Sequence, residues 1–243
     1  MKKALGYFMN WEDTGIVLKY RTYSEKQLIA SVFTQQRGRV DGMITRTKSS
    51  MPQPGDIVTV IQKARLEQHL GTLKIETKQS HSSLQFCDST RVYALKTMLE
   101  ILGSLLPEHH PYLNLWNKVN ETLQLFYDPL KAIKAYCLFE VLLIEELGFG
   151  LSLDSCAVTG GTEKLTHVSP KTGCAVCYEA ALPYIDRLLT LPEFLINKNC
   201  EPTEADFVNS LLLSGHFLVH HASHHKPLPV ARQELIQKLR LGG

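Results

Sequence analysis

The hydrophobic pattern of this chain changes its period once, near residue 80, and this change constrains the fold more than any other feature of the sequence. In residues 15–80, apolar side chains fall into short alternating runs, such as Ile16, Leu18 and Tyr20, which turn residues separate. A period of two is typical of strands. After residue 80 the apolar residues recur every three or four positions, as they do in helices. The sequence therefore predicts an α+β multidomain protein, with a β domain at residues 1–80 and a mainly α-helical domain at residues 81–243.

Five strand-like runs can be counted in the β domain. They cover about residues 16–21, 27–34, 40–45, 56–66 and 72–77. Five short strands match a small closed barrel, and the OB-fold is the five-stranded barrel best known for holding nucleic acid. An SH3-like barrel is the structural alternative.

Helix start and stop signals divide the second domain. Asp88 and Ser89 supply an N-cap for a helix that Pro107 ends, and Asp128 with Pro129 predicts the start of a central helix that stops at Gly148. The stretch at about residues 151–178 is rich in Gly, Thr and Ser and predicts a small hairpin-bearing insert. Further helices are expected at residues 111–126, 179–189, 203–222 and 230–239.

The basic charge lies in the first third of the chain. Residues 1–80 carry 13 Lys and Arg against 7 Asp and Glu, a net charge of +6, whereas residues 81–243 carry 13 against 17, a net charge of −4. Such a distribution is typical of a polyanion-binding module joined to a near-neutral scaffold, although a solvated basic face is the simpler alternative. We expect no signal peptide and no membrane anchor. Six cysteines without regular spacing indicate a reducing, cytoplasmic environment.

A protein that binds DNA without sequence preference needs cations along a groove and flat side chains on which bases stack. Tyr23, in a turn, is the base-stacking candidate, whereas Phe33 is expected in the core and Tyr20 is more typical of a barrel interior. The cations cluster around the third strand and flank the first turn. The expected DNA-binding residues are Lys19, Arg21, Lys26, Arg37, Arg39, Arg46, Lys48, Lys63 and Arg65.

The insert contains one C-x-x-C half-site, Cys174 and Cys177, with Cys156 on the preceding arm. A structural zinc site needs four ligands, so a site here would also require Cys200 or His167. A metal-free hairpin is the favoured interpretation, and no cofactor is expected to be required.

Five histidines lie close together near the end of the expected helix at residues 203–222. His216 and His220 are four positions apart and can share a helix face, as metal ligands of a hydrolase do. However, Phe217 stands where such a motif has glutamate, and histidines near a helix C-terminus also interact favourably with the last carbonyls. We therefore expect a structural role and no enzyme activity. The group is His216, His220, His221, His224 and His225.

Several segments carry a family resemblance through their order and spacing. They are residues 15–18 (GIVL), 139–151 (FEVLLIEELGFGL), 156–160 (CAVTG), 168–173 (VSPKTG) and 228–232 (LPVAR). Together they resemble the RecO family of bacterial DNA repair and recombination mediators over nearly the whole chain. The resemblance implies an N-terminal OB-fold, a helical domain with a zinc-ribbon-like insert, and work in the RecFOR pathway without ATP.

The same resemblance implies several partners. RecO proteins bind single-stranded and double-stranded DNA, anneal complementary strands, contact single-stranded DNA-binding protein and, with RecR, help to load RecA. The acidic tail of single-stranded DNA-binding protein would need a hydrophobic pocket edged by cations. Candidate cations are Lys96, Lys131, Lys134 and Arg232, although ordinary helix-surface charge is the simpler explanation for each one. An OB-fold module that binds RNA is the remaining alternative.

Overall fold

The computed structural model describes residues 9–46, 51–64, 70–197, 199–223 and 226–241. The chain forms two compact units, one made of residues 1–87 and 98–116 and the other of residues 88–97 and 117–243. Helix α1 (Ser89–Leu105) and helix α2 (Leu113–Leu125) each contribute residues to both units. No single position therefore separates the two units.

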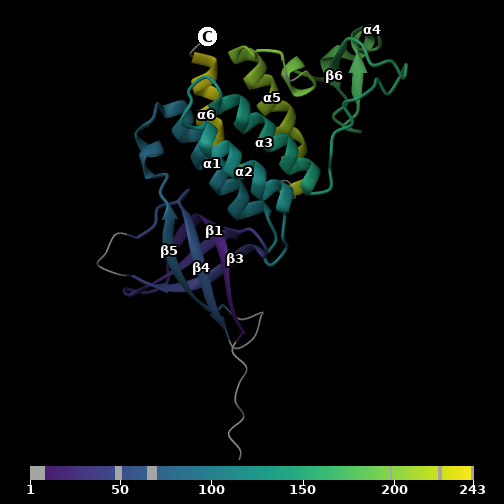
Figure 1. Cartoon of the computed structure of the whole chain (residues 1–243). Coiled ribbons are helices and arrows are strands. Elements are labelled where there is room, and N and C mark those ends of the chain that lie inside the picture. Colours follow the sequence, from purple (N-terminus) through teal and green to yellow (C-terminus); the bar gives the residue numbers. More distant parts are fainter. Residues whose placement is uncertain (1–8, 47–50, 65–69, 198, 224–225, 242–243) are drawn as a thin grey trace, which may run out of the picture. The chain divides into compact units, whose positions relative to one another are not determined.

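The first unit is built on a closed five-stranded barrel in the order β1-β2-β3-β5-β4 (Figure 1). This confirms the predicted OB-type barrel. Strand β1 begins well before the predicted run, because its first half pairs with β4 and its second half with β2. The strands are β1 (Met9–Thr22), β2 (Gln27–Thr34), β3 (Gly38–Thr45), β4 (Ile57–Ala64) and β5 (Thr72–Gln79).

Strand β2 is buried on both faces. Its inward residues, including Ala30 and Val32, belong to the barrel core. Its outward residue Phe33 is fully buried, as predicted, and packs 5.6 Å, centroid to centroid, from the ring of Trp116 at the start of α2. Side chains at this part of the outer surface are therefore used for packing, and a ligand must approach the barrel elsewhere.

The second unit contains helices α3 (Ala132–Glu146), α5 (Glu204–Phe217) and α6 (Val230–Leu241), with α5 packed against both of the others. Helix α3 ends before Gly148, whose φ of +89° suits glycine, as predicted. Its predicted start was wrong. Residues 128–131 form a turn in which the Asp128 carboxylate accepts the backbone N–H of Leu130, and α3 begins only at Ala132.

Helix α5 begins close to the predicted start, at a capping box in which Thr203 and Asp206 satisfy each other's backbone N–H groups. It continues as a π-helical turn at Leu218–Ala222. The expected helix at residues 179–189 is reduced to α4 (Tyr178–Ala181) and the 3-10 helix η2 (Leu182–Arg187), because Pro183 cannot donate to an α-helical ladder. Two further 3-10 helices are η1 (Ser82–Phe86) and η3 (Glu193–Leu195).

The insert is a small three-stranded sheet in the order β7-β6-β8. Strands β6 (Leu165–Val168) and β7 (Ala175–Cys177) form the expected hairpin. Strand β8 (Leu189–Thr190) adds to the free edge of β6, so the sheet extends beyond the predicted insert.

A buried ion pair joins the three helices of the second unit. Arg232 donates from Nε and Nη2 to the two carboxylate oxygens of Glu140 at 2.9 and 2.8 Å. The hydroxyls of Tyr136 and Ser214 donate to the same carboxylate. The guanidinium of Arg232 is therefore buried and bound to internal partners. Its suggested role as a surface cation for a partner tail was wrong.

Among the described residues, no helix combines the length and the apolar character that crossing a bilayer requires.

Candidate nucleic-acid interface

Three of the expected cations meet at the β1–β2 turn. Arg21 lies near the end of β1, Lys26 lies in the turn, and Arg46 follows β3 with its backbone N–H donating to the carbonyl of Lys26 at 2.9 Å. The pairing of β2 with β3 produces this arrangement, since Gln27 lies opposite Thr45. We call Arg21, Lys26 and Arg46 the basic rim. All three side chains are exposed, and within the described part of the chain none forms an ion pair.

Of the basic rim, Lys26 lines an open groove of about 570 Å³, together with Ser24, Glu25, Gln27 and Thr45. Tyr23 lies in the same turn, and its side chain is 62% exposed. A ring exposed beside unpaired cations is available for base stacking. Tyr20 is not, because it packs against the barrel core and its hydroxyl donates to the carbonyl of Pro52 at 2.8 Å.

Two other expected cations, Lys19 and Arg39, contact the C-terminal end of α1 instead. Arg39 donates from Nε to the carbonyl of Leu106 at 2.8 Å and forms ion pairs with Asp41 and Glu108 at 3.0 and 3.1 Å. The Lys19 ammonium lies 3.5 Å from the carbonyl of Gly103. The last carbonyls of a helix carry partial negative charge, so these cations stabilise the helix end. The sequence showed their charge but not these partners.

Arg37 occupies a third environment. Its guanidinium carbon lies 4.8 Å from the ring centroid of Trp11 on β1, which is a cation–π contact. Trp11 is half-buried, and it was not among the residues predicted to bind DNA. The available signal was a tryptophan near the start of the basic domain.

The remaining expected cations are less informative. Lys63 is exposed on β4, opposite Asn10 of β1. Lys48 and Arg65 lie outside the described residues.

The cysteines of the insert do not assemble the four ligands of a zinc site. The backbone N–H of Cys177 donates to the Cys156 sulfur at 3.2 Å, and Thr159 Oγ1 lies 3.8 Å from the Cys177 sulfur. Burial alone would raise the pKa of the Cys156 thiol, but the Thr159 hydroxyl and backbone N–H groups including that of Cys177 lower the pKa to about 6. Cys174 contacts the Thr172 carbonyl instead.

The two proposed additional ligands have other neighbours. His167 Nδ1 lies 2.9 Å from Thr166 Oγ1, and Cys200 lies next to Lys134, which donates to its carbonyl. Across the described ranges, no three His, Cys, Asp or Glu side chains are grouped closely enough to hold a metal ion. The donor set present therefore does not fit a structural zinc.

The histidine group packs against aromatic rings and carbonyls. The His216 ring lies 4.2 Å, centroid to centroid, from that of His220 with the two planes tilted by 54°, and its Nε2 lies 3.1 Å from the carbonyl of Pro170. The His221 ring stacks at 5.0 Å on Phe149. His224 and His225 lie outside the described residues. The contacts of His216 and His221 are those of packed side chains.

The second unit has a groove between α2 and α3, with a volume of about 440 Å³. Its apolar lining includes Leu125 and Leu138, and at its edge Leu130 is 88% exposed. Two suggested tail-binding cations, Lys131 and Lys134, line this groove. Its other charged residues are Lys118, Glu121 and Glu201.

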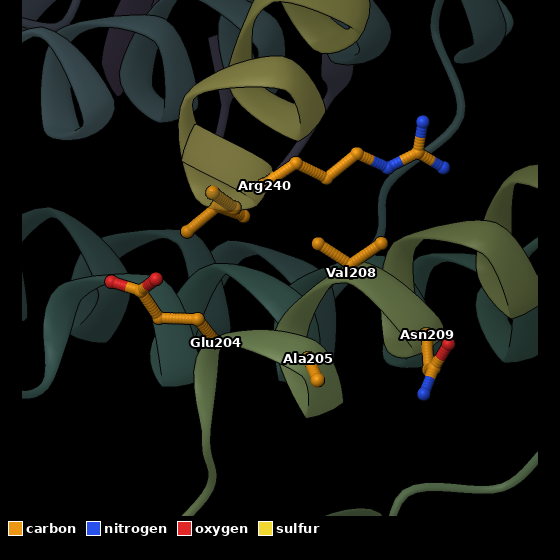
Figure 2. A pocket seen from close by; sticks show the side chains of 6 residues that line it. Glu204, Ala205, Val208, Asn209 and Arg240 are labelled. Carbon is orange, nitrogen blue, oxygen red and sulfur yellow. The ribbon is translucent and has the colours of Figure 1, made fainter. Parts of the chain in front are cut away.

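A second depression lies between the start of α5 and the end of α6. Figure 2 shows Arg240 reaching over α5 from α6, above Val208 and Ala205. Glu204 brings the opposite charge, so this depression has no net positive edge. It is the weaker candidate for an acidic ligand.

Comparisons with known proteins agree with this architecture. A family model described as "Recombination protein O N terminal" matches residues 9–81, and one described as "Recombination protein O C terminal" matches residues 87–226. The DNA repair protein RecO of Bartonella quintana (strain Toulouse) is 36% identical over 236 residues, covering 94% of this chain and 97% of that protein.

Two further relatives give the same result. The DNA repair protein RecO of Xanthobacter autotrophicus (strain ATCC BAA-1158 / Py2) is 38% identical and covers 87% of this chain and 88% of its own length. The DNA repair protein RecO of Agrobacterium fabrum (strain C58 / ATCC 33970) is also 38% identical, and the match covers 88% of this chain and 85% of that protein. Since both family models match in order, and relatives above 30% identity align along most of their length, this chain belongs to the recombination protein O (RecO) family.

Proposed function

We propose that this protein is a DNA repair and recombination mediator that works by binding and not by catalysis. It binds single-stranded and double-stranded DNA through the basic rim, anneals complementary strands and, with RecR, helps to load RecA onto DNA coated by single-stranded DNA-binding protein. Its family and the exposed cations of its barrel support this proposal. The observation that carries the most weight is the rim itself, where three cations face solvent without an ion-pair partner among the described residues.

The mechanism is electrostatic. Cations that neutralise phosphates release condensed counterions, which favours association without regard to base sequence. A protein that holds two strands at once raises the effective concentration of each strand for the other. Annealing then needs neither ATP nor a covalent step, and no zinc or other cofactor is required.

The groove between α2 and α3 suits the tail of single-stranded DNA-binding protein. An acidic segment that ends in apolar side chains needs cations at the edge of the groove and apolar side chains inside it. The groove offers Lys131 and Lys134 at its edge and Leu125 and Leu138 in its lining. Lys131 already pairs with Asp128 at 3.1 Å, so it must exchange one carboxylate for another on binding. An exposed pair of this kind contributes at most about 1 kcal/mol and is easily exchanged.

The tail proposal is tested with a fluorescent peptide of acidic residues ending in two apolar residues. We expect Leu138→Glu to abolish peptide binding, because it places a carboxylate in the apolar lining. Leu212→Glu is the matched control, because Leu212 is exposed on α5 and does not line this groove. Equal peptide binding by both variants and the unchanged protein would contradict the assignment of the groove.

The function is tested by annealing of complementary oligonucleotides, free and coated with single-stranded DNA-binding protein, in the absence of ATP. We expect acceleration that His216→Ala retains and that loss of the basic rim abolishes. An unchanged annealing rate on both substrates would contradict the proposal. Tighter binding of structured RNA than of single-stranded DNA would favour the RNA-binding alternative, and metal-dependent turnover lost in His216→Ala would favour a hydrolase.

A further inference from the structure

Trp11 and Arg37 form a stacked pair on the barrel, apart from the basic rim. Trp11 lies ten positions before Arg21 on β1, a separation of up to about 33 Å along an extended strand. The indole packs on one side against the barrel core. The guanidinium of Arg37, in the turn between β2 and β3, lies over the ring at 4.8 Å.

The turn that carries Arg37 is held firmly. The backbone N–H of Arg37 donates to Thr34 Oγ1 at 3.2 Å, and that of Gln36 donates to Asp13 Oδ2 at 2.9 Å. Gly38 follows with a φ of +69°, and a Cβ there would lie 1.8 Å from the carbonyl oxygen of His110. The position of Arg37 is therefore set before any ligand arrives, which reduces the entropy lost on binding.

The N–H donors of the Arg37 guanidinium are unused in the described structure. Arg39, two residues later, donates to a carbonyl and to two carboxylates, whereas Arg37 has only the ring contact in the described part of the chain. The nearby Asp13 carboxylate accepts the backbone N–H groups of Thr14 and Gln36 and forms no ion pair with Arg37. An arginine that stacks and keeps its donors free can bind a base or a phosphate without losing an internal partner.

A buried polar group opposite Trp11 also supports a binding site here. Gln62 lies opposite Trp11 in the pairing of β1 with β4 and is 3% exposed. Its Nε2 has no hydrogen-bond partner among the described residues. A buried donor without a partner is costly and uncommon in native proteins, so it marks a place where a ligand or a water can supply the missing partner.

We propose that Trp11 and Arg37 form a base-stacking platform for single-stranded nucleic acid, with the Gln62 amide as the unused donor beside it. This inference rests on the proposed function, because it adds a second contact for the same ligand. An unpaired base stacks on the outer face of the Arg37 guanidinium, which already covers the indole, so that base, guanidinium and ring form one stack. A duplex keeps its bases stacked on one another and cannot offer a free face, so the platform selects single strands.

The experiment uses the fluorescence of the full-length chain, which has two tryptophans. Trp116 is 5% exposed and packs against Phe33. Trp116→Phe leaves Trp11 as the sole emitter, and Trp11→Phe leaves Trp116. Each variant is titrated with oligo(dT) and with a blunt duplex, while the anisotropy of labelled DNA reports binding independently. If Trp116→Phe does not fold, the emission difference between the unchanged protein and Trp11→Phe gives the same quantity.

We expect oligo(dT) to quench Trp11 and leave Trp116 unchanged, and duplex DNA to quench neither. Trp11→Leu should weaken oligo(dT) binding by about 5- to 150-fold and leave duplex binding unchanged. Arg37→Ala should weaken oligo(dT) binding more than Lys74→Ala, the charge-matched control on β5. Bound oligo(dT) with unchanged Trp11 emission would overturn the platform while leaving the proposed function intact. Absence of any DNA binding at low salt would overturn both.

Discussion

At the scale of single residues, Glu140 and Arg232 form a buried ion pair that further hydrogen bonds from Tyr136 and Ser214 surround. Burial alone would raise the pKa of Glu140, but the Arg232 guanidinium and the hydroxyls of Ser214 and Tyr136 outweigh burial and lower that pKa. The pair lies between residues 92 positions apart on α3 and α6. It therefore ties the last helix of the chain to the central one.

Removing one member of this pair should destabilise the protein strongly. Arg232→Leu leaves the Glu140 carboxylate buried without its cation, which costs about 3–5 kcal/mol. The free energy of unfolding is measured by urea denaturation, with Lys238→Leu, an exposed position on the same helix, as the control. A loss no larger than that of the control would show that the pair does not join the helices.

The lowered pKa of Glu140 also predicts a pH dependence. A carboxyl group whose folded-state pKa lies below its unfolded value of 4.5 stabilises the protein fully above that pH. This contribution is lost as the pH falls from about 4.5 through the folded-state pKa, because the unfolded state then binds more protons. Urea denaturation at a series of pH values should show a shallower acid-side decline for Glu140→Gln. Parallel declines for the two proteins would contradict the assignment.

The residue scale is where sequence-based prediction was weakest. Arg39, Arg46 and Arg232 are all basic residues in amphipathic segments, yet one closes a helix end, one faces solvent and one is buried. The environment of each arginine depends on partners that are distant in the sequence. Charge counts indicated a basic domain but could not distinguish binding cations from structural ones.

At the scale of elements, the end of α1 shows how a structural cation is used. Arg39 on β3 binds the carbonyl of Leu106 just beyond the helix, and Glu108 in the following loop binds Arg39 in turn. The strand thereby fixes both the end of α1 and the loop after it.

Arg39→Ala and Arg46→Ala should have opposite consequences. Arg39→Ala should lower the free energy of unfolding by about 1.5–3 kcal/mol, because it removes charge-assisted hydrogen bonds, and should change DNA affinity little. Arg46→Ala should weaken DNA binding and leave stability nearly unchanged. Urea denaturation and anisotropy with a labelled oligonucleotide measure the two effects. Equal changes in the free energy of unfolding and in DNA affinity for the two variants would contradict the distinction between structural and binding cations.

Elements whose ends depend on neighbouring residues in the sequence could be predicted. Elements that depend on a helix-breaking residue or on a distant strand could not. The capping box at Thr203 and the glycine stop at Gly148 each involve residues within a few positions of each other, and the expected helix start near residue 203 and stop at Gly148 both formed. The helix expected from Glu179 failed at Pro183, and the strand at Leu189 formed only because an edge of β6 was available. A two-residue edge strand carries no periodic signal.

At the scale of the whole molecule, the β-then-α order was readable because one period gives way to the other near residue 80. The five-stranded barrel followed from the number of runs, and the family from the order of its segments. The candidate interface could be predicted only in part from the sequence. The basic rim depends on the turn after β1 meeting the end of β3, and the Trp11 platform depends on residues from β1, β4 and the β2–β3 turn.

The central claim is that the basic rim grips the sugar-phosphate chain, and its most direct test is the salt dependence of single-stranded DNA binding. Each lost phosphate contact lowers the slope of log K against log salt by about 0.7. The full chain with Arg21, Lys26 and Arg46 all changed to Ala should therefore show a slope about 2 smaller in magnitude than the unchanged protein. A triple variant that binds with the same slope would contradict the account.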